Sequence, residues 1–437
     1  PVGGHPVGDV RPDEVAPGRT RYDKGVQHHG VGAGKNAVTV DAVRGMSFEG
    51  LLLRVRCADK PSAPLVVMIG GRANANYDQN PKSAFNPEEC AKSQVTFAGN
   101  TLTIAGAGPT LHAVSPTPLR FTAADPEAVA KGPAALLVAP AKGASVGALT
   151  LEWPADGEIH LMLTTDDPGA APVAAYLKSP RETFDRAVEE NRALATAVEI
   201  DTPDPWLNAA MPGALLGYNA AWNAPSFRHG AIAWHDTYAG WRVTYGATVA
   251  GWHDRAQSHA KAFYDIQHKD GRIPATLRKD EIYNMGEVLM DQALYDYEWT
   301  GDLAPLKNGG FDAIARHLEW GDKFMKTPDG LYENFLNAWN TDYKWHNGGG
   351  GSIATAYFWR ANKTMAEIAG RIGKDPAVFK ARAGAIAGAM RARLWSERVG
   401  VFGEYRDITG LKLLHESPDL PASTRPSTSD SARPSRP

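Results

Sequence analysis

The heptapeptide TPDGLYE, residues 327–333, points to the architecture of the larger part of this chain, because similar turns recur elsewhere. HKDGRIP at 268–274 and VGVFGEY at 399–405 also place a glycine before an aliphatic or aromatic residue and a short extended piece. The turns are roughly sixty to seventy residues apart, which is room for two helices between one turn and the next. This spacing is typical of stacked α-hairpins, in which each repeat buries its apolar face against its neighbours.

Apolar residues between these turns recur at helical spacing. The helix-length segments are 205–222, 245–267, 283–299, 305–326, 353–373 and 376–395. We therefore predict an all-α domain at 203–416. A linker helix is expected within 173–202, starting at Ser179 and Pro180, and the Ser/Pro/Arg-rich segment 417–437 is expected to be a disordered tail.

The amino-terminal third has a different pattern. Between residues 37 and 165, short runs rich in Val, Leu, Ile and Thr alternate with Gly, Pro and Asn. Such runs predict strands of an antiparallel β-sandwich, with a hairpin turn at Gly99 and Asn100. We assign the sandwich to 1–172 and expect residues before about Tyr22 to form an irregular lead-in.

Composition limits the classes of partner. The chain has 437 residues, 43% of them hydrophobic, which is enough for two domains with separate cores. A formal net charge of -3 argues against nucleic acid, and the lack of any run of eighteen apolar residues argues against membrane insertion. The start PVGGHPVGD has no signal-peptide pattern. We expect a periplasmic or secreted protein, with the cytoplasm as the alternative.

Two cysteines, Cys57 and Cys90, are too few to define a disulfide framework. One bond between them and two reduced thiols are both consistent with the sequence. His235, His253 and His259 lack the close spacing of metal ligands. We therefore expect no metal site and no cofactor.

Tryptophan is concentrated in the helical part, which contains eleven of the twelve Trp residues. Trp rings stack on the C–H faces of sugars, while acids, amides, His and Arg bind the hydroxyl groups. The segment 231–256 combines both kinds of residue and supplies the first candidates for substrate binding: Trp234, His235, Asp236, Trp241 and Arg242. A functional role is favoured for Asp236 and Arg242, because charged residues among aromatic ones need partners, whereas packing in a core is an equal alternative for Trp241.

The segment DGLYENFLNAWNTDYKWH, residues 329–346, forms a second cluster. Its candidates for substrate binding are Trp339, Asn340 and Trp345. Asp342 and Glu333 are candidate catalytic carboxylates, since glycoside hydrolysis uses a pair of acids. The alternative for both acids is helix capping or pairing with Lys344.

Glu287 and Glu404 are further catalytic candidates. Glu287 comes early in a helical segment, where it could instead interact with the helix dipole. Glu404 has the same place in its repeat as Glu333, so both should lie at the same end of the domain.

Three motifs carry a resemblance to a known superfamily. WHDTYAGWRVTYG (234–246), DGLYENFLNAWNTD (329–342) and the helical segment 354–395 resemble the six-hairpin glycosidases, bacterial (α/α)6-barrel glycoside hydrolases that include α-L-rhamnosidases and glucoamylases. The resemblance implies a β + α protein in which an amino-terminal β-sandwich precedes an (α/α)6 toroid. It also implies hydrolysis of O-glycosidic bonds in an oligo- or polysaccharide, with Asp342 where the family's proton donor lies. The helices up to residue 416 are fewer than six hairpins require, so we expect an incomplete toroid whose second carboxylate is absent.

Two other functions fit the same residues. A catalytically inactive carbohydrate-binding protein would keep the Trp clusters, and a glycoside phosphorylase would depend on phosphate. A polysaccharide lyase, a third alternative, would release an unsaturated product.

Overall fold

The computed structural model describes residues 19–31, 37–57, 64–69, 93–106, 109–124, 146–228, 237–277, 285–333 and 349–417. The chain divides into two compact units, residues 1–217 and 218–437, and the boundary falls inside helix α6 (Pro205–Ala221).

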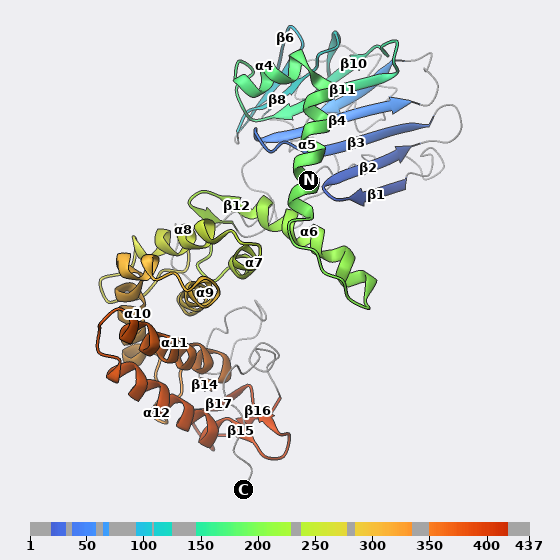
Figure 1. Ribbon diagram of the computed structural model, residues 1–437. Coiled ribbons are helices and arrows are strands. Elements are labelled where there is room, and N and C mark those ends of the chain that lie inside the picture. The colour runs from blue at the N-terminus through green and yellow to red at the C-terminus, as the bar shows by residue number, and fades with distance from the viewer. Residues whose placement is uncertain are drawn as a thin grey trace. The chain divides into compact units, whose positions relative to one another are not determined.

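The first unit is built on two antiparallel sheets (Figure 1). The larger sheet has the strand order β1-β2-β3-β4-β11-β8-β7-β6, and the smaller has the order β5-β10-β9. The strands are β1 (Arg19–Asp23), β2 (Val26–Val31), β3 (Val38–Arg44), β4 (Gly50–Cys57), β5 (Leu65–Ile69), β6 (Gln94–Ala98), β7 (Thr101–Ala105), β8 (Leu111–Val114), β9 (Leu119–Ala124), β10 (Val146–Leu151) and β11 (Glu158–Thr164). The predicted antiparallel sandwich and the hairpin turn at Gly99 are confirmed.

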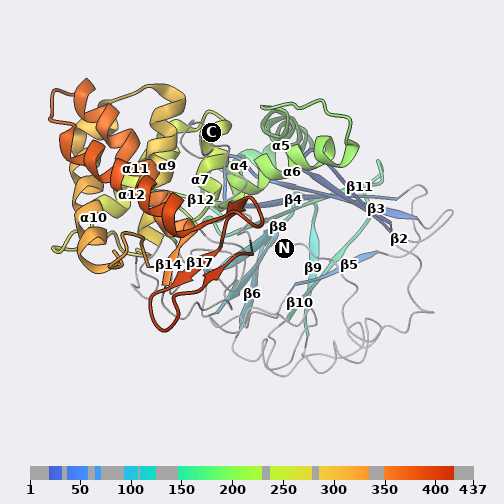
Figure 2. The same ribbon diagram turned by 90° about the horizontal axis from the view of Figure 1, so that it is seen from below.

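Alternating side chains give the larger sheet two apolar faces. Met162 points into a cluster with helices α4 (Ala171–Lys178) and α5 (Pro180–Ala195), whereas its neighbour Leu161 points into a cluster with the smaller sheet. Successive residues of a strand face opposite sides, so both faces of one strand are buried here. The two helices lie on one side of the larger sheet (Figure 2).

The structure adds two details to the expectations for this unit. Strand β1 begins at Arg19, shortly before the expected end of the irregular lead-in, and pairs with β2 as an edge hairpin. Its residues RTRYD are mostly polar, and Tyr22 is exposed, so the strand has little apolar signal. The expected linker helix begins at Pro180 as predicted, but it packs on the sheet through Phe184 and follows a separate helix, α4. The apolar run at 134–140, Cys90 and the segment 418–437 lie outside the described residues.

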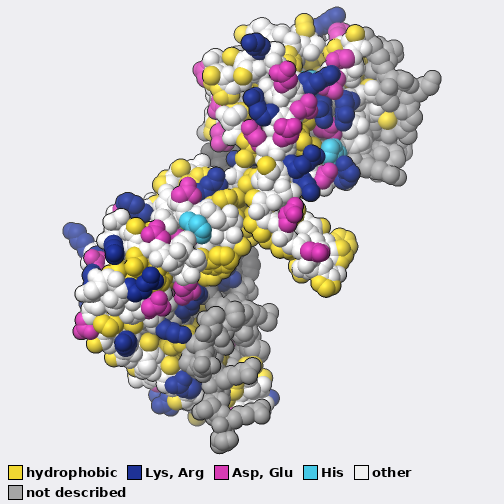
Figure 3. Space-filling model, viewed as in Figure 1, with side chains coloured by type: hydrophobic (Ala, Val, Ile, Leu, Met, Phe, Trp, Pro, Cys, Tyr) yellow, Lys and Arg dark blue, Asp and Glu magenta, His cyan; other side chains and the backbone are white. Residues whose placement is uncertain are grey.

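A buried carboxylate joins three strands of the larger sheet. Asp41 on β3 is fully buried and accepts hydrogen bonds from Arg54 (3.3 Å) and Arg56 (2.5 Å), and it lies 2.7 Å from Nδ1 of His28. Arg54 also donates to Asp185 on α5 at 2.9 Å. Acidic and basic side chains are interspersed on this side of the unit (Figure 3). The network therefore links the sheet to α5.

We expect Asp41→Asn to lower the free energy of unfolding by about 2–3 kcal/mol, because two guanidinium groups lose a charged acceptor. Chemical denaturation of the chain measures this effect. Asp185→Asn is the control, since the Asp185 side chain is 55% exposed and its loss should cost less than about 1 kcal/mol. Equal losses in both variants would contradict this account.

The second unit contains three α-hairpins within its described residues: α7 (Val243–Val249) with α8 (His253–Tyr264), α9 (Met285–Thr300) with η2 (Leu306–Gly310) and α10 (Phe311–Phe324), and α11 (Ser352–Arg371) with α12 (Ala377–Arg393). The turn glycines of the repeat, Gly271, Gly330 and Gly400, have φ angles of 100°, 86° and 75°. Glycine adopts this left-handed conformation without the penalty of a Cβ. The three-fold repeat predicted from the sequence is thus confirmed.

The segment expected as one helix at 245–267 is two helices, α7 and α8, which separate at Gly251 (φ 79°).

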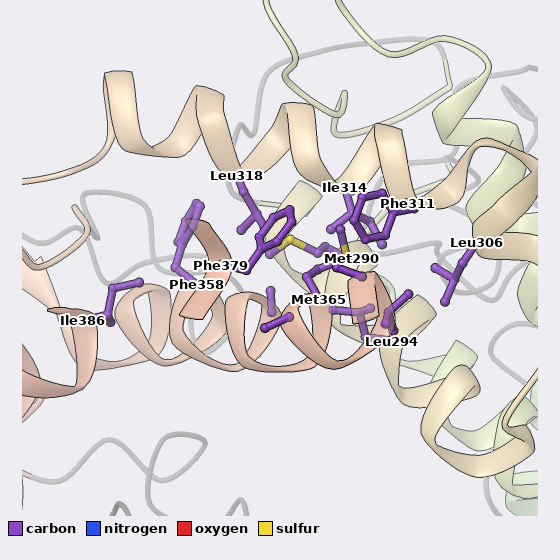
Figure 4. Close-up of a cluster of buried hydrophobic side chains, with 14 of the residues drawn as sticks. Met290, Leu294, Leu306, Phe311, Ile314, Leu318, Phe358, Met365, Phe379 and Ile386 are labelled. Carbon is purple, nitrogen blue, oxygen red and sulfur yellow. The ribbon is translucent and has the colours of Figure 1, made fainter. Parts of the chain in front are cut away.

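Helices α7, α9 and α11 run parallel. Tyr245 and Thr248 of α7 donate to Asp291 and Asp296 of α9, in the same order along both helices. Asp291 and Glu298 of α9 in turn bind Arg360 of α11. Side chains of α9, α10, α11 and α12 meet in one buried cluster that includes Met290, Ile314, Phe358 and Phe379 (Figure 4).

The hairpins therefore place the amino-terminal ends of α7, α9 and α11 together. Among the described helices, none has the length and apolar character that a membrane span requires.

Candidate functional site

Helix α9 carries three buried acids, and two of them have hydrogen-bond donors. Asp296 accepts from Thr248 (3.0 Å) and Gln257 (3.1 Å), and it lies 2.7 Å from Nδ1 of His253. Asp291 accepts from Arg360 at 3.0 Å and from the Tyr245 hydroxyl. Buried carboxylates are normally compensated in this way. Asp291 and Asp296 therefore hold the three parallel helices together.

Glu287, one turn before Asp291, is different. It is 1% exposed, and within the described part of the chain its Oε1 has no hydrogen-bond partner. Burial raises the pKa of Glu287 well above 4.5, and the charge of Glu333 raises this pKa further. The start of a helix favours a negative charge, which would lower the pKa, but desolvation outweighs that effect here. We therefore expect Glu287 to keep its proton to a higher pH than an exposed glutamate does.

This protonation makes a prediction about stability. Above pH 4.5 an unfolded chain ionises Glu287, whereas the folded chain keeps the proton. The folded state then binds more protons, so this group's contribution to stability decreases as pH rises from 4.5 towards the raised pKa. We expect Glu287→Gln to remove this loss and to raise the free energy of unfolding at pH 7 by about 1–3 kcal/mol. Thermal melts at several pH values check it, because the difference between variant and wild type should shrink towards pH 4.5.

Glu333 reaches Glu287 from the turn after α10. The Glu333 amide donates to the carbonyl of Met325 at 2.7 Å, and the residue pairs with Gly350 in strand β14 (Gly349–Gly351). The other edge of β14 pairs with β17 (Tyr405–Asp407), and the carbonyl of Glu404 accepts from the amide of Ser352 at 2.9 Å. Glu333 and Glu404 thus flank the glycine strand at the start of α11. The prediction that they share one end of the domain is confirmed.

The glycines of β14 allow this close pairing. A Cβ on Gly349 would lie 2.4 Å from the carbonyl oxygen of Arg406, which belongs to a paired strand. We expect Gly349→Ala to lower the free energy of unfolding by about 1–3 kcal/mol, because the backbone must shift. A control is Gly384→Ala in α12, where no atom lies within 4 Å of the new Cβ and a small gain in stability is expected. Denaturant titration of the two variants should give changes of opposite sign.

Trp241 and Arg242 lie at the start of α7. Trp241 packs beside a cluster of Phe227, Val243 and Ala247, and its carbonyl accepts from Nε2 of Gln292 at 2.7 Å. Trp241 is only partly buried, so its role in substrate binding stays a prediction. Arg242 has two buried nitrogens, Nε and Nη2, for which the described residues offer no acceptor.

The other candidates lie outside the described residues and remain predictions. They are Asp342, Trp234, His235, Asp236, Trp339, Asn340 and Trp345.

His259 is buried, and burial lowers its pKa to about 4. The described ranges contain no group of three or more His, Cys, Asp or Glu residues that could hold a metal ion.

The sequence contained one further signal. In YNMGEVLMDQALYDYEW, acids follow one another at helical spacing among apolar residues. This pattern indicates acids on a buried helix. Buried acids need hydrogen-bond donors, so the pattern could have predicted that Asp291 has donors on neighbouring helices.

A cavity of about 700 Å³ lies between α8 and the η2–α10 segment. It is separate from the candidate site, because neither Glu287 nor Glu333 lines it.

No family model matches the chain, and no curated protein matches it in sequence. Among solved structures, it is similar to a GH92 family glycosyl hydrolase, with 15% identity over 90% of this chain and 54% of that chain and a TM-score of 0.45. An inverting mannosidase of family GH92 from Bacteroides thetaiotaomicron has 10% identity over 90% and 54% of the two chains, with a TM-score of 0.46. A rhamnosidase from Klebsiella oxytoca has 13% identity over 80% and 73%, with a TM-score of 0.41. The chain spans about half the length of the two GH92 structures.

Proposed function

We propose that this chain provides acid–base residues of a glycoside hydrolase, with Glu287 as the proton donor and Glu333 as the neighbouring carboxylate. The observation that carries the proposal is Glu287 itself, a buried carboxyl group close enough to Glu333 to feel its charge, whose Oε1 has no hydrogen-bond partner among the described residues. A general acid must hold its proton at the working pH, and burial near a second carboxylate is the usual way to achieve this.

In the proposed reaction, Glu287 acts as the acid and Glu333 as the carboxylate. Glu287 gives its proton to the glycosidic oxygen while the bond to the anomeric carbon breaks, so the leaving group departs as an alcohol. The Glu333 carboxylate stabilises the positive charge that develops at the anomeric carbon. Water then adds its oxygen to that carbon, and its released proton restores the protonated carboxyl.

The sequence supports a saccharide as the substrate. Eleven of the twelve Trp residues belong to the helical part, and Trp rings are well suited to stacking on sugar faces. Asp342 remains the further carboxylate expected from the sequence, on the connection from Glu333 to Gly349.

The direct experiment measures release of p-nitrophenol from a panel of aryl glycosides, with oligosaccharides alongside. We expect turnover without added phosphate, at least about 100-fold slower in Glu333→Gln and Asp342→Asn. Turnover that requires phosphate would indicate a phosphorylase, and an unsaturated product would indicate a lyase. Sugar binding without turnover would reject the hydrolase in favour of a binding protein.

A further inference from the structure

Arg242 carries a positive charge that the described residues do not neutralise. Two of its guanidinium nitrogens are buried without an acceptor. Two other half-buried arginines have carboxylate partners: Arg360 pairs with Asp291 and Glu298, and Arg54 pairs with Asp41 and Asp185. Burying a cation without a counter-ion is strongly unfavourable, since its N–H groups lose water and gain nothing in return.

The position of Arg242 connects it to the proposed catalytic acid. Arg242 precedes Tyr245 by three residues, and Glu287 precedes Asp291 by four. Tyr245 and Asp291 are hydrogen-bonded across α7 and α9. Residues three or four apart share one face of a helix. Arg242 and Glu287 therefore occupy corresponding positions, one turn nearer the amino-terminal ends of two parallel helices.

Gln292 adds an acceptor next to this donor. Its Nε2 binds the carbonyl of Trp241, the residue before Arg242, and its buried Oε1 has no donor within the described ranges. A ligand hydroxyl would satisfy Oε1. A hydroxyl on Arg242 would leave the charge of the guanidinium without a counter-ion, whereas an oxyanion would neutralise it and fit its planar set of donors.

We propose that the site binds an acidic saccharide, whose carboxylate or phosphate group pairs with Arg242 while a nearby hydroxyl donates to Oε1 of Gln292. The saccharide part of this inference rests on the proposed function. Glu287 is a poor counter-ion for Arg242, because burial disfavours its charged form and raises its pKa well above 4.5.

The test compares binding of D-glucuronate, glucose 6-phosphate and glucose to the full chain by isothermal titration calorimetry. We expect at least one of the two acidic sugars to bind tenfold or more tightly than glucose, and the stronger of them identifies the anion as carboxylate or phosphate. Arg242→Met should abolish the preference. Lys323→Met, an equal change of charge on the exposed side of α10, should leave it unchanged.

Two results would overturn the inference. One is glucose bound as tightly as both acids, the result expected if a carboxylate of the chain itself, such as Asp236, neutralises Arg242. The other is a preference for acids that survives in Arg242→Met. Should that variant fail to fold by circular dichroism, Arg242→Gln replaces it. The binding test and the activity test can fail independently. A chain that binds acidic sugars through Arg242 but does not cleave glycosides supports the acidic-saccharide site and rejects the hydrolase. A chain that cleaves neutral glycosides independently of Arg242 supports the hydrolase and rejects the acidic-saccharide site.

Discussion

Replacing Glu287 by glutamine is expected to reduce kcat by about 10²–10⁴-fold on a glycoside whose leaving group needs protonation. Glutamine keeps the shape of the side chain and its place in the first turn of α9, but it has no proton to give. The loss should be smaller for p-nitrophenyl glycosides than for oligosaccharides, because p-nitrophenolate leaves without help from an acid. Comparing kcat for both kinds of substrate isolates proton donation from a general effect on structure.

The control for this variant is Glu319→Gln. Glu319 is exposed on α10, so its change of charge should leave kcat unaltered. A Glu287→Gln chain that cleaves oligosaccharides at the wild-type rate would refute the assignment of the proton donor.

Replacing Asp291 by asparagine is expected to lower the free energy of unfolding by about 3–5 kcal/mol, because it leaves the Arg360 cation short of a buried acceptor. Asp291 is 1% exposed, as is Glu287 one turn away, yet the two residues should respond in opposite directions. Asp291 is compensated by Tyr245 and Arg360, whereas Oε1 of Glu287 has no partner among the described residues.

Denaturant titration of Asp291→Asn and Glu287→Gln at pH 7 measures both changes. A destabilisation of similar size in the two variants would mean that Glu287 is a structural acid like Asp291, and the argument for its catalytic role would fail.

Much of the architecture could be predicted from the sequence, because it depends on local patterns. The glycines at the three turns and the helical spacing between them specify the hairpins, and Glu333 and Glu404 could be placed at one end from their positions in the repeat. Short apolar runs likewise specify most of the sandwich. The β1–β2 hairpin escaped prediction because an edge hairpin of polar residues has little apolar signal.

The special character of Glu287 could not be predicted. Its sequence context equally fits an acid that interacts with a helix dipole. Burial of this carboxyl arises from packing of α9 among its neighbouring helices, and the effect of Glu333 arises from a residue 46 positions later in the chain. Such properties depend on contacts between distant segments, so they appear only in the folded chain.

The central claim is that Glu287 is protonated at neutral pH, and infrared difference spectroscopy tests it directly. The C=O stretching band of a protonated carboxyl group should be present at pH 7 in the wild-type chain and absent in Glu287→Gln. It should also shift in frequency in Glu333→Gln, where the neighbouring charge is lost. If wild type and Glu287→Gln have the same spectrum in this region at pH 7, Glu287 is ionised and the account of the site is contradicted.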